Sequence, residues 1–495
     1  MSSLLGRGVV YATAVVVART LGPAVYGLLA LGVAVTHFSL ALGRGGIDKG
    51  VVRYIAIFGG EGRYGRAKEV LLAGTLAGIL ISCIVALGQF LSARLLAEDF
   101  FGKPQSAPFI AALSFLVIAR AVLAVLIAAL RALRLSVPYA IVEHFVSPLA
   151  GLLGFCAASV FGIAQFGATW YRAAGAAIAV PVAVCFLLRE RVLCRSGQTA
   201  VHLWQDLRML LAFSLPLMFS DLGLRVIAAA DVIMLGRYSL ASQVGSYQAA
   251  IEMNTIALLG LGSVGMASAP MFSHLHNRRN RVELENVLAR STRWALSIAS
   301  PALACCVLFP DVLLSIYGAG YAKAALPLAI LAVGQLLHVA TGPVGWLLSM
   351  SGRSLLTMAN TWAVGLLNVI LNLYLIPRMG MVGAALATAT ALAVMKVATV
   401  IQVRVLVEVG PFSYRSAVVA GIATVAYGGG WLVSRLFSLD SLFWKWVMIG
   451  SSTFIYAATV LLITTDRDDR NMLRTIARSL GFRGAARTQP PNHSG

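Results

Sequence analysis

Charged residues and long polar segments are both scarce in this sequence. Only 12% of its 495 residues are charged, whereas an average soluble domain has roughly 25%. Hydrophobic residues make up 59%, and the mean hydropathy is +0.84. The connections between hydrophobic runs are too short for a folded domain, which needs roughly 50 residues. The composition therefore excludes a soluble protein and most soluble enzyme chemistry, and we expect no enzymatic activity.

Motifs that hold cofactors are missing as well. The six cysteines form no Cys-x-x-Cys pair, so neither a disulfide framework nor a zinc site is indicated. The chain has no Gly-rich phosphate loop, Walker lysine motif or His-Glu-x-x-His signature, so direct coupling to ATP is unsupported. We therefore expect no metal and no cofactor, apart from a proton or sodium ion that would be coupled to the activity.

Hydrophobic runs of the length of a membrane span are what the sequence has in abundance. Each run is close to the roughly 20 residues that an α-helix needs to cross a bilayer. The runs predict an all-α integral membrane protein with about 14 transmembrane helices. These helices are predicted near residues 4–20, 24–44, 68–93, 108–133, 139–162, 168–188, 209–237, 244–271, 286–316, 324–350, 355–376, 380–403, 416–437 and 442–465.

The basic residues alternate with these spans. The formal net charge is +20, but Lys and Arg do not gather in one soluble region, so no nucleic-acid partner is expected. Most of them follow the even-numbered helices or lie in the C-terminal tail. Cytoplasmic loops carry the excess of Lys and Arg in membrane proteins. The pattern thus predicts a multi-pass protein of a bacterial cytoplasmic (inner) membrane, with both termini in the cytoplasm.

Weak internal repetition divides the predicted helices into two lobes. The turn at residues 21–27 resembles the segment at 235–247, about 215 residues later, and a second pair of Gly-bearing turns recurs at a similar offset. Two six-helix lobes related by a parallel repeat, plus two C-terminal helices, are the simplest interpretation, since transporters commonly contain such repeats. The alternative is that Gly and Tyr merely favour turns at the membrane interface. The predicted parts are an N-lobe (1–190), a cytoplasmic linker (191–208), a C-lobe (209–404), two further helices (405–465) and a basic cytoplasmic tail (466–495).

Two ionisable residues lie close together in the seventh predicted span. Arg225 is near its middle, and Asp221 is four residues earlier on the same helical face. A charge inside the hydrocarbon costs roughly 2.5 to 3.5 kcal/mol, so it needs a partner or an aqueous cavity. The two side chains form either a self-contained ion pair or part of the wall of a central cavity. In such a cavity the guanidinium of Arg225 would bind an anionic phosphate.

Two more arginines are candidates for the wall of a cavity. Arg120 is in the middle of the fourth predicted span and has no acidic neighbour on its own helix, so its partner must come from another helix. Arg7 is in the first predicted span, where it either snorkels to the membrane interface or faces the cavity.

Asp231, Glu252 and Asn254 are candidates for an ion-coupling site. Asp231 and Glu252 are predicted at similar depth on neighbouring antiparallel helices. Two carboxylates that meet at low dielectric cannot both stay ionised, so one would bind a proton or, with Asn254, a sodium ion. The alternative is that each carboxylate is separately hydrogen-bonded to a polar neighbour such as Arg237.

Five segments of the sequence carry a family resemblance. They read ARTLGPAVYGLLALG (18–32), SLPLMFSDLGLRVIAAADVIMLG (214–236), VGSYQAA (244–250), YGAGYAKAALPLAILA (317–332) and NLYLIPRMGMVGAALATA (372–389). With them, nearly the whole chain resembles Wzx-type oligosaccharide flippases and related polysaccharide biosynthesis proteins of the multidrug/oligosaccharidyl-lipid/polysaccharide exporter superfamily. The resemblance implies a central cavity lined by the first, second, seventh and eighth helices, and this favours the cavity interpretation of Arg225.

The resemblance also implies a function. A protein of this kind would flip an oligosaccharide linked to a polyprenyl diphosphate across the cytoplasmic membrane by alternating access, for polysaccharide biosynthesis. Membrane lipids, and a polysaccharide polymerase and glycosyltransferases, would be its partners. The alternatives are a small-molecule or multidrug cation antiporter of the same superfamily, a lipid II flippase, and a non-transporting scaffold of a polysaccharide assembly complex.

Overall fold

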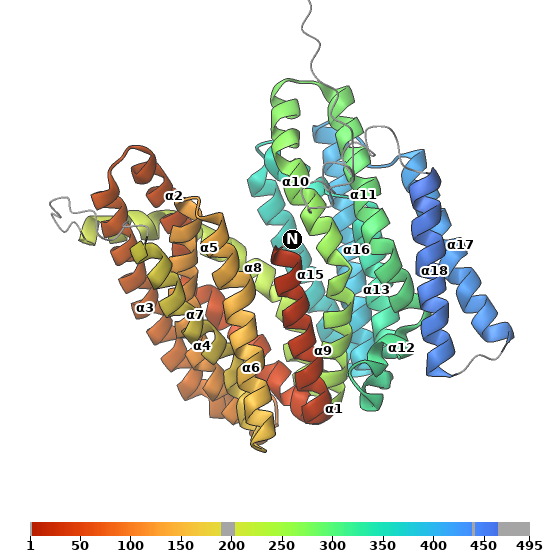
Figure 1. Ribbon diagram of the computed structural model, residues 1–495, viewed down its shortest axis with the longest axis horizontal. Helices are drawn as coiled ribbons and strands as arrows, with labels where there is room; N and C mark the ends of the chain where they lie inside the picture. The colour runs from red at the N-terminus through yellow and green to blue at the C-terminus, as the bar shows by residue number, and fades with distance from the viewer. Residues whose placement is uncertain (1, 190–202, 438–440, 464–495) are drawn as a thin grey trace, which may run out of the picture. The chain divides into compact units, whose positions relative to one another are not determined.

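The computed structural model describes residues 2–189, 203–437 and 441–463, and every regular element in these ranges is a helix (Figure 1). Most of the predicted linker and the whole predicted basic tail lie outside the described residues. The described residues up to 411 form one compact unit, and those from 412 onward form a second.

The first unit contains two groups of helices. Residues 2–189, which we call the N-lobe, consist of α1 (Ser2–Arg44), α2 (Ile47–Gly60), α3 (Tyr64–Leu95), η1 (Leu96–Phe100), η2 (Pro104–Ser106), α4 (Ala107–Ala132), α5 (Ser136–Ala140), η3 (Ile141–Val146), α6 (Ser147–Val160) and α7 (Ala164–Arg189). Residues 203–406, which we call the C-lobe, consist of α8 (Leu203–Tyr238), α9 (Ala241–Ile256), α10 (Leu258–Asn277), α11 (Arg281–Leu308), α12 (Pro310–Ser315), η4 (Ala319–Ala324), α13 (Ala325–Ala340), α14 (Val344–Met350), α15 (Ser354–Met379) and α16 (Met381–Leu406).

The number of membrane spans differs slightly from the prediction. Among the described residues, 12 helices are long and apolar enough to cross a membrane, or 13 if the bent pair of α9 and α10 is one span. The all-helical membrane fold is therefore confirmed, but the count of 14 is not. One span fewer comes from the first two predicted spans, which belong to one helical run, Gly6–Gly60, and the eighth predicted span is the bent pair itself.

A break at Gly22 interrupts this first run. A straight helix of 55 residues would be about 80 Å long, far more than the roughly 30 Å of the hydrocarbon core. Gly22 has φ 73° and ψ 168°, which is not helical and which residues other than glycine rarely adopt. Pro23 follows it, so the sequence ends one helix and starts the next at this point. We call the end of the bundle that contains this break the Gly22 end, and the opposite end, where α1 finishes, the Arg44 end.

α1 and α8 join the two lobes. α2 to α7 pack mainly on one another, and so do α9 to α16, in line with the predicted two-lobe arrangement (Figure 1). α8 contacts α2 and α3 of the N-lobe and also α15 of the C-lobe. Its first half lies against the N-lobe, where the carbonyl of Ser214 adjoins Gly46, and its second half lies against Trp362 of α15 at Gly223. Pro216 lies between these two contacts.

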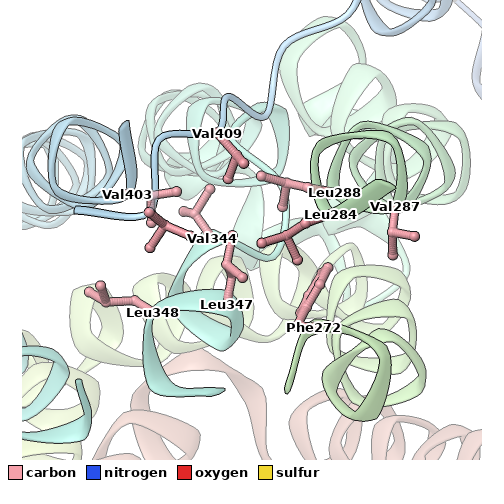
Figure 2. Packing of buried hydrophobic residues seen from close by; sticks show 10 residues of the cluster. Phe272, Leu284, Val287, Leu288, Val344, Leu347, Leu348, Val403 and Val409 are labelled. Atoms are coloured by element: carbon pink, nitrogen blue, oxygen red, sulfur yellow. The ribbon is translucent and has the colours of Figure 1, made fainter. Parts of the chain in front are cut away.

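An apolar cluster closes the Arg44 end of the C-lobe, and Figure 2 shows its side chains pointing toward one another. α10, α11, α14 and α16 contribute to it, together with the segment that follows α16. Its members are Phe272, Leu284, Val287, Leu288, Val344, Leu347, Leu348, Val403, Val407 and Val409. Because lipid tails are as apolar as these side chains, close packing rather than the hydrophobic effect holds such helices together in a membrane.

The second unit contains α17 (Tyr414–Leu436) and α18 (Leu442–Ile463), which pack against each other. The Tyr427 hydroxyl donates to Oγ1 of Thr453 at 2.9 Å. These helices correspond to the last two predicted spans.

Candidate functional site

The N-lobe encloses a cavity of about 380 Å³, and one residue of α8 completes its wall. This volume is within the roughly 300–1,000 Å³ of small-molecule sites. α1, α4, η3, α6 and α7 contribute the other residues. The lining residues are Val10, Thr13, Val33, Thr36, His37, Leu40, Arg44, Leu116, Arg120, Glu143, Ser147, Pro148, Gly151, Tyr171, Arg172 and Arg225.

A second chamber of about 380 Å³ shares Arg44, Arg120 and Glu143 with the first. Its other lining residues come from α2, α4 and α5, toward the Arg44 end: Asp48, Lys49, Val52, Ala124, Ile127, Ala128, Arg131 and Tyr139. We call the two chambers together the cationic cavity, because six Lys and Arg but only two acidic residues line them.

Helical spacing explains why these side chains share one space. Side chains three or four residues apart lie on the same face of a helix. On α1 the lining residues include Val33, His37, Leu40 and Arg44, and on α4 they recur from Leu116 to Arg131 at the same spacing. The cavity is thus formed where the faces of these helices that carry His37, Arg44 and Arg120 meet.

Arg225 lines the first chamber, but it does not pair with Asp221 as one interpretation of the sequence expected. Oδ1 of Asp221 accepts a hydrogen bond from Nζ of Lys49 on α2 at 2.7 Å. Arg225 makes no side-chain hydrogen bond or ion pair with any described residue. Asp221 therefore pairs with Lys49 of α2 instead of with Arg225 on its own helix. This leaves the guanidinium of Arg225 available to a ligand.

Arg120 and Arg7 have different surroundings. Arg120 lines both chambers, and its acidic partner is Glu143 of η3, with 3.6 Å between Nη1 and Oε2. Glu143 supplies the partner that sequence reasoning could not name. Arg7 is exposed on α1 and is not among the lining residues of either chamber.

Sequence reasoning missed two arginines and an unusual set of polar atoms. Arg44 and Arg172 line the first chamber, and each lies within a predicted span, which was the signal that could have identified them. Nε of Arg172 donates to the hydroxyl of Tyr171 at 2.7 Å. Nδ1 of His37, Nε of Arg44 and Oδ1 of Asp48 are buried and have no hydrogen-bond partner in the part of the chain that the structure describes. Buried polar atoms are rarely left unpaired, so this wall is suited to water or a polar ligand.

Asp231 lies in a separate polar network inside the C-lobe. Its side chain is 3% exposed. Oδ2 accepts hydrogen bonds from the Tyr247 hydroxyl at 2.8 Å and from Thr388 at 3.5 Å, and Oδ1 accepts the backbone N–H of Val232. The network continues from Thr388 to Asn368 on α15. Asp231 is therefore held by groups of α8, α9 and α16.

Glu252 lies at the contact between the lobes. Its Oε1 accepts hydrogen bonds from Tyr26 of α1 at 2.8 Å and from Gln248 at 3.1 Å, and its Oε2 accepts one from Tyr317 at 3.4 Å. No hydrogen bond joins Glu252 to Asp231 among the described residues, so each carboxylate has its own set of partners. Asn254 is buried, and its Oδ1 has no hydrogen-bond partner within residues 2–189, 203–437 and 441–463.

The lobes meet closely at the Gly22 end. A Cβ on Gly27 would lie 1.8 Å from the carbonyl oxygen of Ala241, and a Cβ on Gly245 would lie 2.0 Å from that of Pro23. The two contacts are reciprocal. Gly27 meets Ala241, which lies four residues before Gly245, and Gly245 meets Pro23, which lies four residues before Gly27. This symmetry relates the two segments that the internal repeat paired, and only glycine fits at either position.

Two further hydrogen bonds join the lobes at the Gly22 end. The hydroxyl of Tyr321 donates to the carbonyl of Ala18 at 2.7 Å. Lys103, in the loop before α4, donates to the carbonyl of Gly236 near the end of α8, where a cation is favoured by the helix dipole. Burial and the nearby Arg237 lower the pKa of the Lys103 amine.

Comparisons with known proteins agree with this architecture. The family described as polysaccharide biosynthesis protein matches residues 1–276, and the MatE family matches residues 216–374. The probable low-salt glycan biosynthesis flippase Agl15 of Haloferax volcanii is 28% identical over 192 residues, which are 39% of this chain and 41% of the relative. The match thus spans about two fifths of the length of that relative.

Two solved structures have the same fold. The lipid II flippase MurJ in an inward closed conformation has a TM-score of 0.72 at 15% identity, over 96% of this chain and 98% of that one. An inward-facing multidrug resistance MATE family transporter has a TM-score of 0.65 at 14% identity, over 80% of this chain and 94% of that one.

The fold and the family matches define a multi-pass membrane protein of the multidrug/oligosaccharidyl-lipid/polysaccharide exporter superfamily. Since the matched region covers more than half of the sequence, the chain belongs to the polysaccharide biosynthesis protein family.

Proposed function

We propose that this protein is a flippase, not an enzyme, that moves an oligosaccharide linked to a polyprenyl diphosphate across a membrane. The observation that carries the proposal is the cationic cavity, in which Arg44, Arg172 and Arg225 have no acidic partner among the described residues. A sugar head cannot cross hydrocarbon unaided, because each unsatisfied polar group costs several kcal/mol. A polar cavity removes that cost, and its arginines suit phosphate oxygens, which guanidinium groups bind in a fork.

The same charges argue against cationic drugs as the cargo. A cavity for organic cations needs acidic or aromatic groups that outweigh its positive charge. Here the acidic lining residues Asp48 and Glu143 and the aromatic Tyr139 and Tyr171 stand among six Lys and Arg. The relative Agl15, whose name describes a probable glycan biosynthesis flippase, agrees with a glycan cargo.

The contacts between the lobes support a mechanism of alternating access. At the Gly22 end, Gly27, Gly245, Tyr26 and Glu252 hold α1 against α9. We assign this end to the outer face, because most Lys and Arg of the loops lie at the other end, as expected of the cytoplasmic side. The described conformation is then closed on the outside, and export requires this contact to open.

Ion coupling is proposed at Asp231 rather than at a pair of carboxylates. Asp231 is buried with neutral partners, Tyr247 and Thr388. A buried carboxylate with no cationic partner is costly in its ionised form, so binding a proton or a sodium ion would stabilise it. Glu252 and Asn254 would not share an ion with Asp231. Glu252 instead accepts a hydrogen bond across the contact between the lobes.

The proposed setting is a bacterial cytoplasmic (inner) membrane, with both termini in the cytoplasm. There the protein would receive its cargo from glycosyltransferases and deliver it to a polysaccharide polymerase. Membrane lipids would surround the spans.

Gene deletion followed by mass analysis of polyprenyl-linked intermediates tests the function. We expect the complete lipid-linked oligosaccharide to accumulate while the exported polysaccharide is lost. Wild-type protein and Arg94→Ala, which changes an exposed arginine on α3, should restore export. Arg225→Ala should not, although the protein remains in the membrane. Accumulation of an incomplete glycan would instead indicate an enzyme, and unchanged lipid-linked glycans would contradict a flippase.

A further inference from the structure

Glu252 places a carboxylate at the contact between the lobes, and no basic residue of the described ranges forms an ion pair with it. Its oxygens accept hydrogen bonds from the hydroxyls of Tyr26 and Tyr317 and from the amide of Gln248. These neutral partners orient the carboxylate without cancelling its charge. An ionised group at membrane depth is costly, so this carboxylate depends on a positive charge farther away.

Arg172 supplies that charge from the wall of the cationic cavity. It is the basic residue whose charge acts most strongly on Glu252, and Glu252 acts on Arg172 in turn. Arg172 lines the first chamber, and its Nε donates to the hydroxyl of Tyr171 at 2.7 Å. Tyr171 also lines the chamber and acts electrostatically on Tyr26. A series of polar groups therefore connects the chamber to the contact between the lobes.

The first half of α1 separates the chamber from Glu252. Val10 and Thr13 of this helix line the chamber. Tyr11 is on another face of the helix and interacts electrostatically with Glu252. A cargo in the chamber would thus be one helix away from Glu252, where it cannot touch the carboxylate. Its charge can still act there, because the low dielectric of a protein interior screens charges weakly.

We propose that Glu252 makes opening of the Gly22 end conditional on an anionic cargo, an inference that rests on the proposed flippase function. While the chamber is empty, the charge of Arg172 stabilises the Glu252 carboxylate, which holds α1 through Tyr26. An anion in the chamber cancels the effect of Arg172, and a carboxylate that has lost its compensating charge is costly inside a protein. The closed contact then weakens, and opening lets water solvate Glu252. A neutral lipid leaves the contact closed.

A first test uses the fact that coupling between two sites acts in both directions. If a bound anion destabilises the Glu252 carboxylate, the carboxylate lowers the affinity of the chamber for that anion. Undecaprenyl diphosphate should therefore bind purified full-length Glu252→Gln about fivefold more tightly than wild type, at the lower end of the usual coupling. Arg172 holds the anion on the side nearest Glu252, so in an Arg172→Gln background the same substitution should change the affinity by about twofold or less. Glu98→Gln, which changes an exposed carboxylate, should bind like wild type.

A second test measures the opening itself. Spin labels at Phe161→Cys and Met379→Cys are exposed on the two lobes. Undecaprenyl diphosphate should lengthen the distance between the labels in otherwise wild-type protein, whereas undecaprenol, the neutral lipid with the same chain, should not. In Glu252→Gln the distance should no longer respond to the diphosphate, because the amide needs no compensating charge.

The contrary results separate the inference from the function on which it rests. Equal affinity of wild type and Glu252→Gln, or a difference that persists with Arg172→Gln, would overturn the role of Glu252. Opening by undecaprenol would overturn the requirement for an anion. Diphosphate binding without any change of distance would overturn the inference and leave the role of the cavity intact. A folded wild-type protein that does not bind the diphosphate would overturn the proposed flippase function as well.

Discussion

Asp231 shows how this protein accommodates single buried charges. Its carboxylate is nearly inaccessible, and its hydrogen bonds come from a tyrosine hydroxyl, a threonine hydroxyl and a backbone N–H rather than from a cation. Such partners orient the group without neutralising it. For this reason we propose Asp231 as the group that binds the coupling ion.

Replacing Asp231 by Asn tests ion coupling at this residue. The amide is isosteric: its oxygen can still accept the N–H of Val232, and its NH2 group can donate to the hydroxyls of Tyr247 and Thr388 when these rotate to accept. It cannot exchange a proton or neutralise sodium. We expect transport by the wild-type protein in vesicles to rise about tenfold when a sodium or proton gradient is imposed, within the usual range of coupling between sites. Asp231→Asn should lose this response, and the exposed Asp99→Asn should keep it. A full response in Asp231→Asn would exclude Asp231 as the coupling site.

At the residue scale, the sequence predicted which charges are deep but not which groups they meet. Arg120, Arg225 and Asp231 were identified from their position within apolar runs. Their surroundings depend on other helices: Glu143 reaches Arg120, and Lys49 takes Asp221 away from Arg225. Local spacing favours a partner four residues away, but a group from a neighbouring helix replaces it when the packing brings it closer.

At the scale of elements, α1 and α9 form the closest contact between the lobes. Gly27 and Gly245 face the backbone of the opposite helix, with no room for a methyl group. The internal repeat indicated that the two segments correspond, but not that they touch each other. A repeat within the sequence shows that two segments are equivalent. Whether those segments touch depends on whether the symmetry axis between the lobes passes beside them.

Gly245→Ala should loosen this contact. The added Cβ would lie 2.0 Å from the carbonyl oxygen of Pro23, and overpacking of this kind typically costs about 1–3 kcal/mol. The outward-open population should then increase about tenfold for each 1.4 kcal/mol. Spin labels at Phe161→Cys and Met379→Cys, exposed on the two lobes, would report longer distances in Gly245→Ala. Gly88→Ala, where a Cβ meets nothing within 4 Å, is the control, and an unchanged distance distribution in Gly245→Ala would contradict the gating role of the contact.

At the scale of the whole molecule, the lobes place a polar, positively charged cavity inside an apolar bundle. Because the arginines stay with the protein while the proposed cargo leaves, we expect the membrane potential to assist its export. Two negative charges moved outward gain about 4.6 kcal/mol at 100 mV. Composition and hydropathy were sufficient to predict the all-helical membrane fold. The resemblance predicted a cavity that contains Arg225, but it named the walls only in part. Apart from Arg225 of α8, the lining comes from helices of the N-lobe, and the eighth predicted span contributes none of it, because the chambers arise where helices far apart in the sequence meet.

The flipping rate of a fluorescent undecaprenyl-diphosphate-linked oligosaccharide in vesicles that contain only this protein is the most direct test of the account. Wild-type protein should flip the lipid, and Arg225→Ala should be at least about tenfold slower, as expected for the loss of one charge-assisted contact of roughly 1.5–3 kcal/mol. Equal rates for the wild type and Arg225→Ala, or no flipping by folded wild-type protein, would contradict the claim that the cationic cavity carries the diphosphate between leaflets.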